Sequence, residues 1–286
     1  MKESKSILIY GLFVTLFISS CATNDKIEND NQNSDIPQKV IDAATKLNFN
    51  TSTIRYEFIR TVNNKLEKKI VIENDIMTTE NQLIELTHLK NNRTDQYYTN
   101  NLVTQGKIIK ITGYNGGRSS FKLSEKGLKA LKNAVAKFND LNLSLTFVFE
   151  ETKLWGAGDI FVYDMSRFNS SKGGRAGFPY KGKPYNEIQI FNLDQHTQIE
   201  NQHVLMHEIS HSIGMRHTDW FGRNSCKGDF EDEGDAGVGI NHIDGTPNES
   251  YYDNTSIMLA CPFNEEMTGE FNNNDVKSLK TLYPKE

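Results

Sequence analysis

The segment that most constrains this chain is residues 207–217, which read HEISHSIGMRH. His207 and His211 stand four residues apart, so on a helix both imidazoles project from one face and can share a metal ion. Gly214 has no Cβ, which lets the chain leave that helix through a left-handed turn and bring His217 round as a third ligand. Three nitrogen ligands at about 2.0–2.1 Å suit Zn²⁺ and leave a fourth position open. The spacing therefore predicts a zinc site at the end of a helix.

Glu208 follows the first predicted ligand and is not itself expected to bind the ion. Its carboxylate can take a proton from a water molecule at the metal and return it to a leaving amine, so we predict that it is the general base. The alternatives are a core helix with three buried histidines and a structural zinc site without turnover. A structural site needs neither Glu208 nor an open coordination position.

The segment resembles the metzincin zinc endopeptidases, whose long histidine motif is followed by a methionine turn. Residues 256–259 (SIML) stand in a suitable place for that turn, and the resemblance implies that Met258 forms an apolar floor beneath the zinc histidines. More narrowly, the run Val204–Trp220, with an acidic glycine-rich loop and the SIMLAC segment, is similar to the bacterial dual-action HEIGH metallopeptidases. Two departures are Ser210, where that group has Gly, and Ala260, where some metzincins place a tyrosine.

Apolar periodicity elsewhere predicts an α+β fold. The order of strands and helices over residues 105–286 is similar to that of a metzincin catalytic domain. This resemblance implies a mixed twisted sheet with an antiparallel edge strand, followed by the active-site helix, the methionine turn and a C-terminal helix. We expect strands at 107–112, 143–150, 159–163, 173–185 and 187–191, and helices at 125–140, capped by Ser124, and from a cap at Asn274 or Asp275 through Leu282.

The apolar pattern of residues 37–104 predicts a small N-terminal α+β region. It should contain a helix from Pro37 to Leu47, a hairpin of 54–62 and 65–72 joined by Asn63-Asn64, and a second helix around 79–89. Roughly 70 residues are marginal for an independent core, so the region should lean on its neighbour. Since many secreted metzincins are made latent, it is either a propeptide or a permanent accessory region. It contains no cysteine, so a blocking group would be a carboxylate, with Asp75 and Asp95 as candidates.

The first 20 residues have the order of a secretory signal: Lys2 and Lys5, an apolar run over 7–18, then small residues. Ser19-Ser20-Cys21 resembles the end of a bacterial lipobox, which implies that Cys21 is lipidated and becomes the first residue of the mature chain. A buried N-terminal helix with a free cysteine is the alternative. Residues 21–36 are polar and have too few apolar side chains to form a core, so we expect them to be a tether.

Charge and cysteine content narrow the remaining possibilities. A formal net charge of −5 argues against a nucleic-acid-binding protein, which shows a basic face. Export would place Cys226 and Cys261 in an oxidising compartment, where a disulfide between them is expected and two buried free thiols are the alternative.

Several other polar residues have two interpretations each. Asp219 could replace His217 as a ligand or accept a hydrogen bond from a ligand histidine, and we favour the second. His203, four residues before His207, could support a metal ligand or rim the cleft, and we favour a plain surface histidine. An acidic cluster could bind Ca²⁺ or form a solvated face; its members are Asp229, Glu231, Asp232, Glu233 and Asp235. For His88, His196 and His242 the sequence suggests no partner.

Together these features predict an exported zinc endopeptidase, lipid-anchored at the periplasmic face or the cell surface of a bacterium. Its substrate should be a protein or peptide that lies extended along the edge strand near 173–185 and pairs by backbone hydrogen bonds. The alternatives are a surface binding or adhesion lipoprotein that holds zinc without turnover, and a zinc hydrolase acting on another kind of amide.

Overall fold

The computed structural model describes residues 36–47, 49–88, 98–99, 101–168, 173–220, 223–226, 243–244, 246–247, 253–262 and 267–285. All of them belong to one compact unit, Ser34–Glu286. The predicted signal segment 1–20, Cys21 and the tether up to residue 35 lie outside the described residues, as do Asp95, His242 and the acidic cluster 229–235. In the described part of the chain, no helix is long and apolar enough to cross a membrane.

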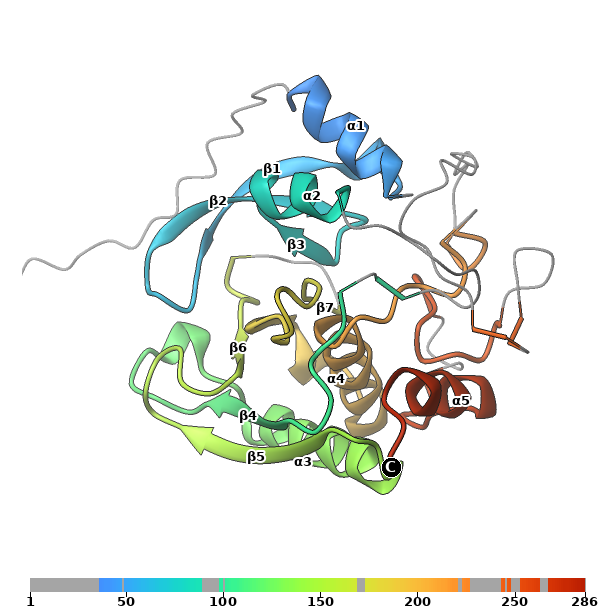
Figure 1. Cartoon of the computed structure of the whole chain (residues 1–286). Helices are drawn as coiled ribbons and strands as arrows, with labels where there is room; N and C mark the ends of the chain where they lie inside the picture. Colours follow the sequence, from blue (N-terminus) through green and yellow to red (C-terminus); the bar gives the residue numbers. More distant parts are fainter. Residues whose placement is uncertain are drawn as a thin grey trace, which may run out of the picture. The chain divides into compact units, whose positions relative to one another are not determined.

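A five-stranded sheet with the order β5-β4-β6-β8-β7 forms the centre of residues 105–286 (Figure 1). Its strands are β4 (Ile108–Tyr114), β5 (Thr146–Thr152), β6 (Ile160–Asp164), β7 (Gly173–Arg175) and β8 (Glu187–Phe191). Neighbouring strands are parallel except at one edge, where β7 runs antiparallel to β8. The predicted α+β fold with a mixed sheet and an antiparallel edge strand is confirmed.

Two strands are shorter than their sequence patterns predict. Strand β5 begins at Thr146 and not at Leu143, because the Ser144 N–H donates to the Tyr283 carbonyl, outside the sheet. Strand β7 ends at Arg175, although the prediction extended to residue 185. Two prolines, at 179 and 184, lie in that stretch and lack the N–H that a strand donates.

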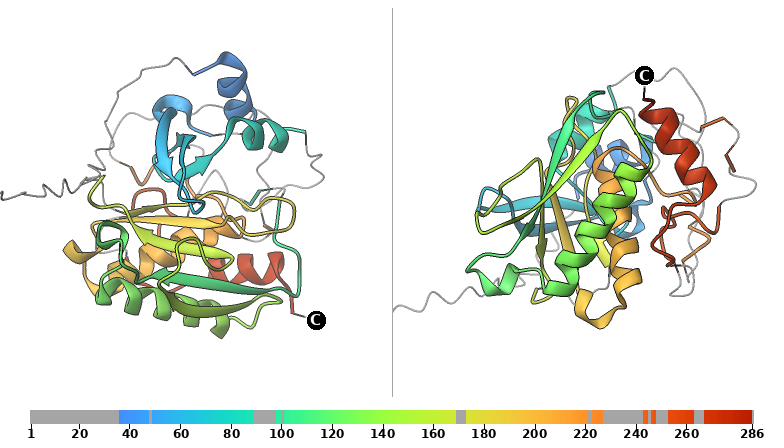
Figure 2. Two further views of the ribbon diagram at one scale, coloured as in Figure 1. Left: turned by 90° about the vertical axis from the view of Figure 1, so that its left-hand side faces the viewer. Right: turned by 90° about the horizontal axis from the view of Figure 1, so that it is seen from below.

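Two long helices, α3 (Glu125–Asp140) and α4 (Gln198–Ser212), pack side by side and contact the sheet (Figure 2). The Ser124 hydroxyl accepts a hydrogen bond from the Gly127 N–H and caps α3, as predicted. The α3 residues predicted to face the core are all buried: Leu128, Leu131, Val135 and Phe138. Short 3-10 turns complete this part, η2 (Ser119–Phe121) and η3 (Leu193–Gln195).

The C-terminal helix, α5 (Asn273–Leu282), is capped by Asn272. The prediction of Asn274 or Asp275 as the cap was wrong. Asn272 Oδ1 accepts from the Asp275 N–H at 2.8 Å and Asp275 Oδ2 accepts from the Asn272 N–H at 3.1 Å, which is a reciprocal capping box. Asp275 therefore occupies the third helical position, where its carboxylate also reaches residues 256 and 257.

The region before residue 105 contains a second, antiparallel sheet, β1-β2-β3, and two helices. Its elements are α1 (Gln38–Lys46), η1 (Thr51–Thr53), β1 (Arg55–Arg60), β2 (Leu66–Ile72), β3 (Ile76–Thr78) and α2 (Glu80–Leu86). The two helices and the hairpin turn at 63–64 lie where the sequence predicts them. Val40, Ile70 and Leu83 are fully buried in a core that also takes in Phe178 from the larger part of the chain.

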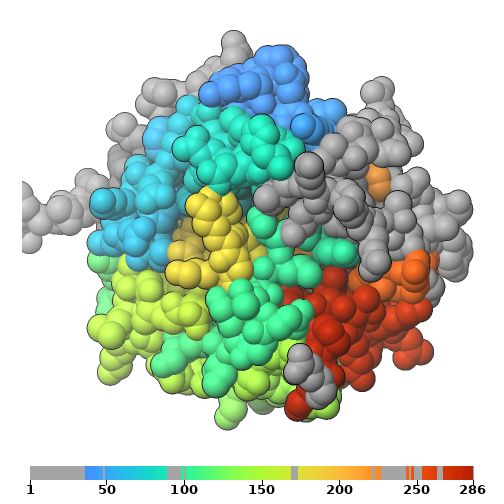
Figure 3. Space-filling model, viewed as in Figure 1, coloured from blue at the N-terminus to red at the C-terminus, as the bar shows by residue number. Residues whose placement is uncertain are grey.

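This N-terminal region lies beside the end of β7, where Ile76 forms a bridge with Ala176. In Figure 3 its cyan atoms lie directly against yellow atoms from the larger part of the chain. The Met77 N–H donates to the Ala176 carbonyl at 2.6 Å, and the Ala176 N–H donates to the Asp75 carbonyl at 2.9 Å. Just before Ala176, the Arg175 guanidinium makes two bonds to the Glu57 carboxylate, at 2.5 and 3.1 Å. Residues 75–77 thus pair with the chain that continues from the edge strand.

Candidate metal centre

Helix α4 begins at a reciprocal cap and ends near a glycine. Thr197 Oγ1 accepts from the Glu200 N–H at 3.2 Å, and Glu200 Oε2 accepts from the Thr197 N–H at 2.5 Å. Two residues beyond α4, Gly214 has φ +116°, which side-chain-bearing residues rarely adopt. A Cβ at this position would lie 2.9 Å from Leu102 Cδ2 and 3.2 Å from the Asn101 carbonyl oxygen. Glycine is therefore required for the chain to turn back here.

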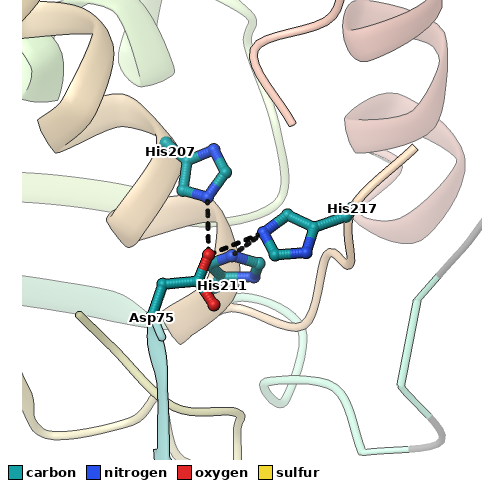
Figure 4. A group of neighbouring side chains, drawn as sticks. All are labelled: Asp75, His207, His211 and His217. Carbon is teal, nitrogen blue, oxygen red and sulfur yellow. Dashed lines mark hydrogen bonds and ion pairs between the residues drawn. The ribbon is translucent and has the colours of Figure 1, made fainter. Parts of the chain in front are cut away.

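That turn brings three buried histidines together with an aspartate from the N-terminal region (Figure 4). The ring centroids of His207, His211 and His217 are 4.5–5.3 Å apart. Asp75 Oδ2 lies 2.9 Å from His217 Nε2 and 4.0 Å from His207 Nε2. One atom from each of the four side chains lies within 4.8 Å of the others.

Each of the three histidines has its Nδ1 held by an acceptor, so its Nε2 faces the centre. A carbonyl or an ionised carboxylate can only accept a hydrogen bond, so each Nδ1 carries a hydrogen and Nε2 is the atom that can bind a metal. The three bonds run from His207 to the Ile257 carbonyl (2.8 Å), from His211 to the Met215 carbonyl (2.8 Å) and from His217 to Glu73 Oε2 (3.0 Å).

The spacing of these atoms fits a tetrahedral zinc ion. Bonds of about 2.0–2.1 Å give ligand atoms about 3.3 Å apart at the corners of a tetrahedron. The Nε2 atoms of His211 and His217 are 3.2 Å apart, which is close to this spacing. Burial lowers the pKa of His207 to about 4 and that of His211 well below its usual range, which keeps both rings neutral and ready to bind a metal.

Two carboxylates give the centre a negative field. Burial opposes the ionised form of Glu73, but His217 and Arg223 hold its pKa at about 2, and Arg223 Nη1 lies 3.1 Å from Glu73 Oε2. Burial likewise opposes a charged His217, yet Asp75 and Glu73 raise its pKa to about 9 in the metal-free protein. The site therefore stabilises positive charge, which is the charge that Zn²⁺ would supply.

Glu208 lies in the same cleft as His207 and Asp75. It is 2 % exposed, and its Oε2 has no hydrogen-bond partner among the described residues. Burial raises the pKa of its carboxyl well above the usual range, and the nearby Asp75 adds to this. A Cβ on Gly174 would come within 2.6–2.8 Å of the Glu208 side chain, so the edge strand needs glycine where it passes this carboxylate.

The model of the dual-action HEIGH metallopeptidase family matches residues 70–283, which is more than half of the chain. The chain belongs to this family. Two solved structures of myroilysin are similar to this metallopeptidase, each at 17 % sequence identity over 64 % of its length. The matches cover 95 % and 85 % of the two myroilysin chains, with TM-scores of 0.38 and 0.35. No curated relative matches the chain. The family is the one that the sequence motifs predict.

Met258, the residue predicted in the methionine turn, is fully buried in the main core of the metallopeptidase. Its carbonyl accepts from the Thr218 N–H at 2.9 Å, next to the third histidine. Asp275 on α5 accepts from the Ser256 hydroxyl at 2.5 Å and the Ile257 N–H at 3.0 Å. Because the Ile257 carbonyl holds His207, α5 supports the metal centre through this turn.

Asp219 does not accept a hydrogen bond from a histidine among the described contacts, contrary to the expected role. Its carboxylate accepts from the Ser225 N–H and hydroxyl, at 3.0 and 2.5 Å, and from the Ala260 N–H at 3.0 Å. It therefore holds the segment after the third histidine against the segment after Met258. A disulfide between Cys226 and Cys261 joins the same two segments.

Glu73 holds His217, the role that we expected of Asp219, and sequence reasoning missed it. Glu73 and Asp75 lie in the turn between β2 and β3, more than 100 residues before the histidines. Asp75 was one of two candidates for a blocking carboxylate, and it lies at the centre. For Glu73 the sequence carries no signal beyond an acidic residue in a short turn.

Proposed function

We propose that this metallopeptidase is an exported, lipid-anchored zinc endopeptidase that cleaves bonds within protein substrates. His207, His211 and His217 hold the ion, and Glu208 is the general base. The observation that carries this proposal is that the Nε2 atoms of three histidines converge beside the buried Glu208 carboxyl group, whose Oε2 has no hydrogen-bond partner among the described residues. We assign to Met258 the apolar floor beneath the histidines, which its full burial in the main core supports.

The zinc ion, when bound, supplies the Lewis acid that polarises the scissile carbonyl and activates a water molecule. Glu208 accepts the proton of that attacking water and passes it to the leaving amine. Its Oε2 is buried in the cleft beside His207 and has no hydrogen-bond partner among the described residues, so it can receive that proton. Glu73 and the two backbone carbonyls keep the three rings oriented, so each Nε2 stays available to the metal.

The substrate would lie along the edge of the five-stranded sheet and pair with the backbone near Ala176. Both the N–H and the carbonyl of Ala176 point outward to a neighbouring chain, which here is residues 75–77. An extended peptide in the same place would pass Glu208 and the histidines, because Gly174 lies against Glu208.

Hydrolysis of a denatured protein by residues 22–286 tests this function, with zinc content measured for every variant. We expect Glu208→Gln to keep zinc and to lose activity by about 10²–10⁴-fold, because the amide cannot accept the proton. The matched control is Glu150→Gln, a surface change on β5. Zinc-loaded Glu208→Gln protein that cuts as fast as wild type would refute the base. If no form of residues 22–286 cuts although all hold zinc, the chain is either latent behind residues 37–104 or a binding lipoprotein without turnover, and the same assay on Asp75→Ala distinguishes the two.

Export and lipidation are supported by the sequence of residues 1–21, with its charged, apolar and small-residue parts in order. The Cys226–Cys261 disulfide supports the same location, since such bonds persist in oxidising compartments. Metabolic labelling of the expressed protein with palmitate tests the anchor, and Cys21→Ser should abolish the label.

We also propose that residues 37–104 keep the enzyme latent, with Asp75 as the blocking group. Asp75 Oδ2 lies where a fourth zinc ligand would stand, 2.9 Å from His217 Nε2. Residues 75–77 run parallel to the chain at Ala176 and bond its N–H and carbonyl, the two groups with which the substrate should pair. Both the open coordination position and the substrate edge are thus filled by the chain's own N-terminal region. The alternative, a permanent accessory region, would need the substrate to bind elsewhere.

A further inference from the structure

Arg175, the last residue of β7, has a buried guanidinium group that the mechanism does not use. Its Nη1 and Nη2 donate to the two carboxylate oxygens of Glu57 at 2.5 and 3.1 Å, and its Nε donates to the Asn74 carbonyl at 2.9 Å. On the other side, the guanidinium lies over the Phe191 ring, 5.1 Å from its centroid. Among the described residues, all the acceptors of Arg175 thus belong to the N-terminal region.

Arg175 stands at the sheet edge where the substrate should pair. Gly174, which precedes it, lies against the Glu208 side chain, and Ala176, which follows it, offers its N–H and carbonyl to a neighbouring chain. Side chains alternate between the two faces of a strand, so Arg175 projects to the face opposite Glu208. Side chains of paired strands that share a face lie about 4.5–5.5 Å apart. A substrate strand beside Ala176 would therefore bring one of its side chains next to Arg175, close to the bond that is cut.

The N-terminal region shows which groups this guanidinium binds. Residues 75–77 lie where the substrate should pair, Asn74 just before them supplies a backbone carbonyl, and Glu57 on the nearby β1 supplies a carboxylate. Two parallel N–H donors make a guanidinium the best match for a carboxylate. The Glu57 side chain is 30 % exposed and that of Arg175 is 4 % exposed, so it is the carboxylate that separates the guanidinium from solvent.

Displacement of the N-terminal region would leave Arg175 without its carboxylate. Glu57 would keep a cation of its own, because Arg55 Nη2 on the same strand lies 2.7 Å from Glu57 Oε1. Arg175 would stay oriented, since the pairing of β7 with β8 fixes its backbone and the Phe191 ring supports its guanidinium. An exposed guanidinium in a fixed place favours an acidic side chain, because an amide offers one acceptor oxygen and an ammonium group is repelled.

We propose that Arg175 is a specificity-determining residue that binds a glutamate or aspartate side chain of the substrate close to the scissile bond, in the place that Glu57 holds here. The substrates of the enzyme are therefore acidic stretches of protein. This inference rests on the proposed endopeptidase function and on the displacement of the N-terminal region from the sheet edge.

The test is cleavage of a peptide library by zinc-loaded residues 22–286, as wild type and as Asp75→Ala, with the cut sites read by mass spectrometry. We expect acidic residues to be enriched at one position flanking the cut. For matched peptides with Glu or Gln there, kcat/KM should favour Glu about tenfold or more, as expected for hydrogen bonds between charged groups. In the Asp75→Ala protein, Arg175→Gln should bring this ratio close to one, and Arg175→Glu should make a Lys peptide the better substrate. The control is Arg167→Gln, an exposed arginine after β6.

The outcomes separate this inference from the proposed function. Each ratio compares two peptides with one enzyme, so a variant that only docks the N-terminal region less tightly changes both rates and leaves the ratio as it was. Cleavage without acidic enrichment, or a ratio unchanged by Arg175→Gln at equal zinc content, overturns the role of Arg175 and leaves the endopeptidase standing. If neither wild type nor Asp75→Ala cleaves any peptide while zinc is bound, the proposed function fails and the role of Arg175 fails with it.

Discussion

Glu73 and Asp75 stand two residues apart in one turn, and each reaches a different nitrogen of His217. Glu73 Oε2 is 3.0 Å from His217 Nδ1, and Asp75 Oδ2 is 2.9 Å from its Nε2. The turn that presents them holds Glu73 at φ 56° and Asn74 at φ 70°, a left-handed backbone that non-glycine residues adopt at a cost of about 1–3 kcal/mol each. The ion pairs of Glu73 with His217 and Arg223 offset that cost. At the scale of single residues, this turn places two carboxylates on one predicted metal ligand.

Replacing Asp75 by alanine should activate the full chain. Without the carboxylate the fourth position opens to water, so we expect hydrolysis of a denatured protein to rise at least tenfold. In cobalt-substituted protein the visible absorption spectrum should change, because a ligand is lost. Asp42→Ala, on the exposed face of α1, is the control. Equal rates and identical spectra for wild type and Asp75→Ala would show that Asp75 does not block the site.

At the scale of elements, β7 and the turn after α4 position the side chains of the candidate site. Each has a glycine where another part of the chain leaves no room for a Cβ. Gly174 on β7 lets the edge strand pass the Glu208 side chain. Gly214 beyond α4 combines a positive φ with contacts to residues 101 and 102. The capping box of Thr197 and Glu200 starts α4 at a defined residue, which sets the direction in which His207 and His211 project.

Gly214→Ala should weaken both folding and zinc binding. A methyl group at φ +116° is strained and would lie 2.9 Å from Leu102 Cδ2, so we expect a loss of about 1–3 kcal/mol in the free energy of unfolding. The displaced turn should also lower zinc affinity, measured by competition with a chelator. Gly117→Ala is the matched control, because a Cβ there meets nothing within 4 Å. Equal zinc affinity for both variants would contradict the role given to this turn.

On the scale of the whole molecule, polar contacts join the N-terminal region to the five-stranded sheet. Glu187 on β8 is 1 % exposed, accepts from the Val62 N–H at 3.2 Å and lies 3.9 Å from Lys69 Nζ. Tyr163 and Trp155 donate to the carbonyls of Arg60 and Thr61. These contacts are polar and in part buried, so the free energy of docking should depend on the charge of Glu187.

The stability of the protein should fall with rising pH through Glu187. Burial raises the pKa of its carboxyl, although Lys69 opposes the shift. The unfolded chain then loses this proton first, so the folded state binds more protons above pH 4.5 and the free energy of unfolding decreases until the raised pKa is passed. For each unit by which the pKa of this carboxyl is higher in the folded than in the unfolded protein, the free energy of unfolding falls by about 1.4 kcal/mol over this pH range. Urea unfolding at saturating zinc from pH 5 to 7.5 should show a smaller decrease for Glu187→Gln. Parallel curves for the two proteins would exclude this contribution.

The disulfide should stabilise the whole catalytic part of the molecule. Cys226 and Cys261 are separated by 35 residues, and closing a loop of this size is worth about 2–4 kcal/mol. The double variant Cys226→Ser/Cys261→Ser should unfold at lower temperature and bind zinc less tightly, since the bond joins the segments after His217 and after Met258. Calorimetry with zinc titration measures both. An unchanged Tm would show that Asp219 alone holds these segments together.

The sequence by itself determined the parts of the protein whose signals are local. The spacing of His207, His211 and His217 identified the helix, its exit and the family. The apolar period of α3 and the turn at 63–64 located a helix and a hairpin almost to the residue. Such features depend on residues within about two helical turns of each other, so periodicity and capping chemistry express them directly. Where four neighbours had similar capping chemistry, at residues 272–275, local reasoning offered Asn274 or Asp275 and missed Asn272.

Only the tertiary structure decided which distant residues complete the centre. It gave His217 the partner Glu73, gave Asp219 partners other than a histidine, placed Asp75 among the three rings, and buried His203. These contacts join positions more than 100 residues apart, or depend on which face of α4 is covered. A chain carries no periodic signal for such pairings, because they arise from how separate elements pack and from the need to compensate buried charge.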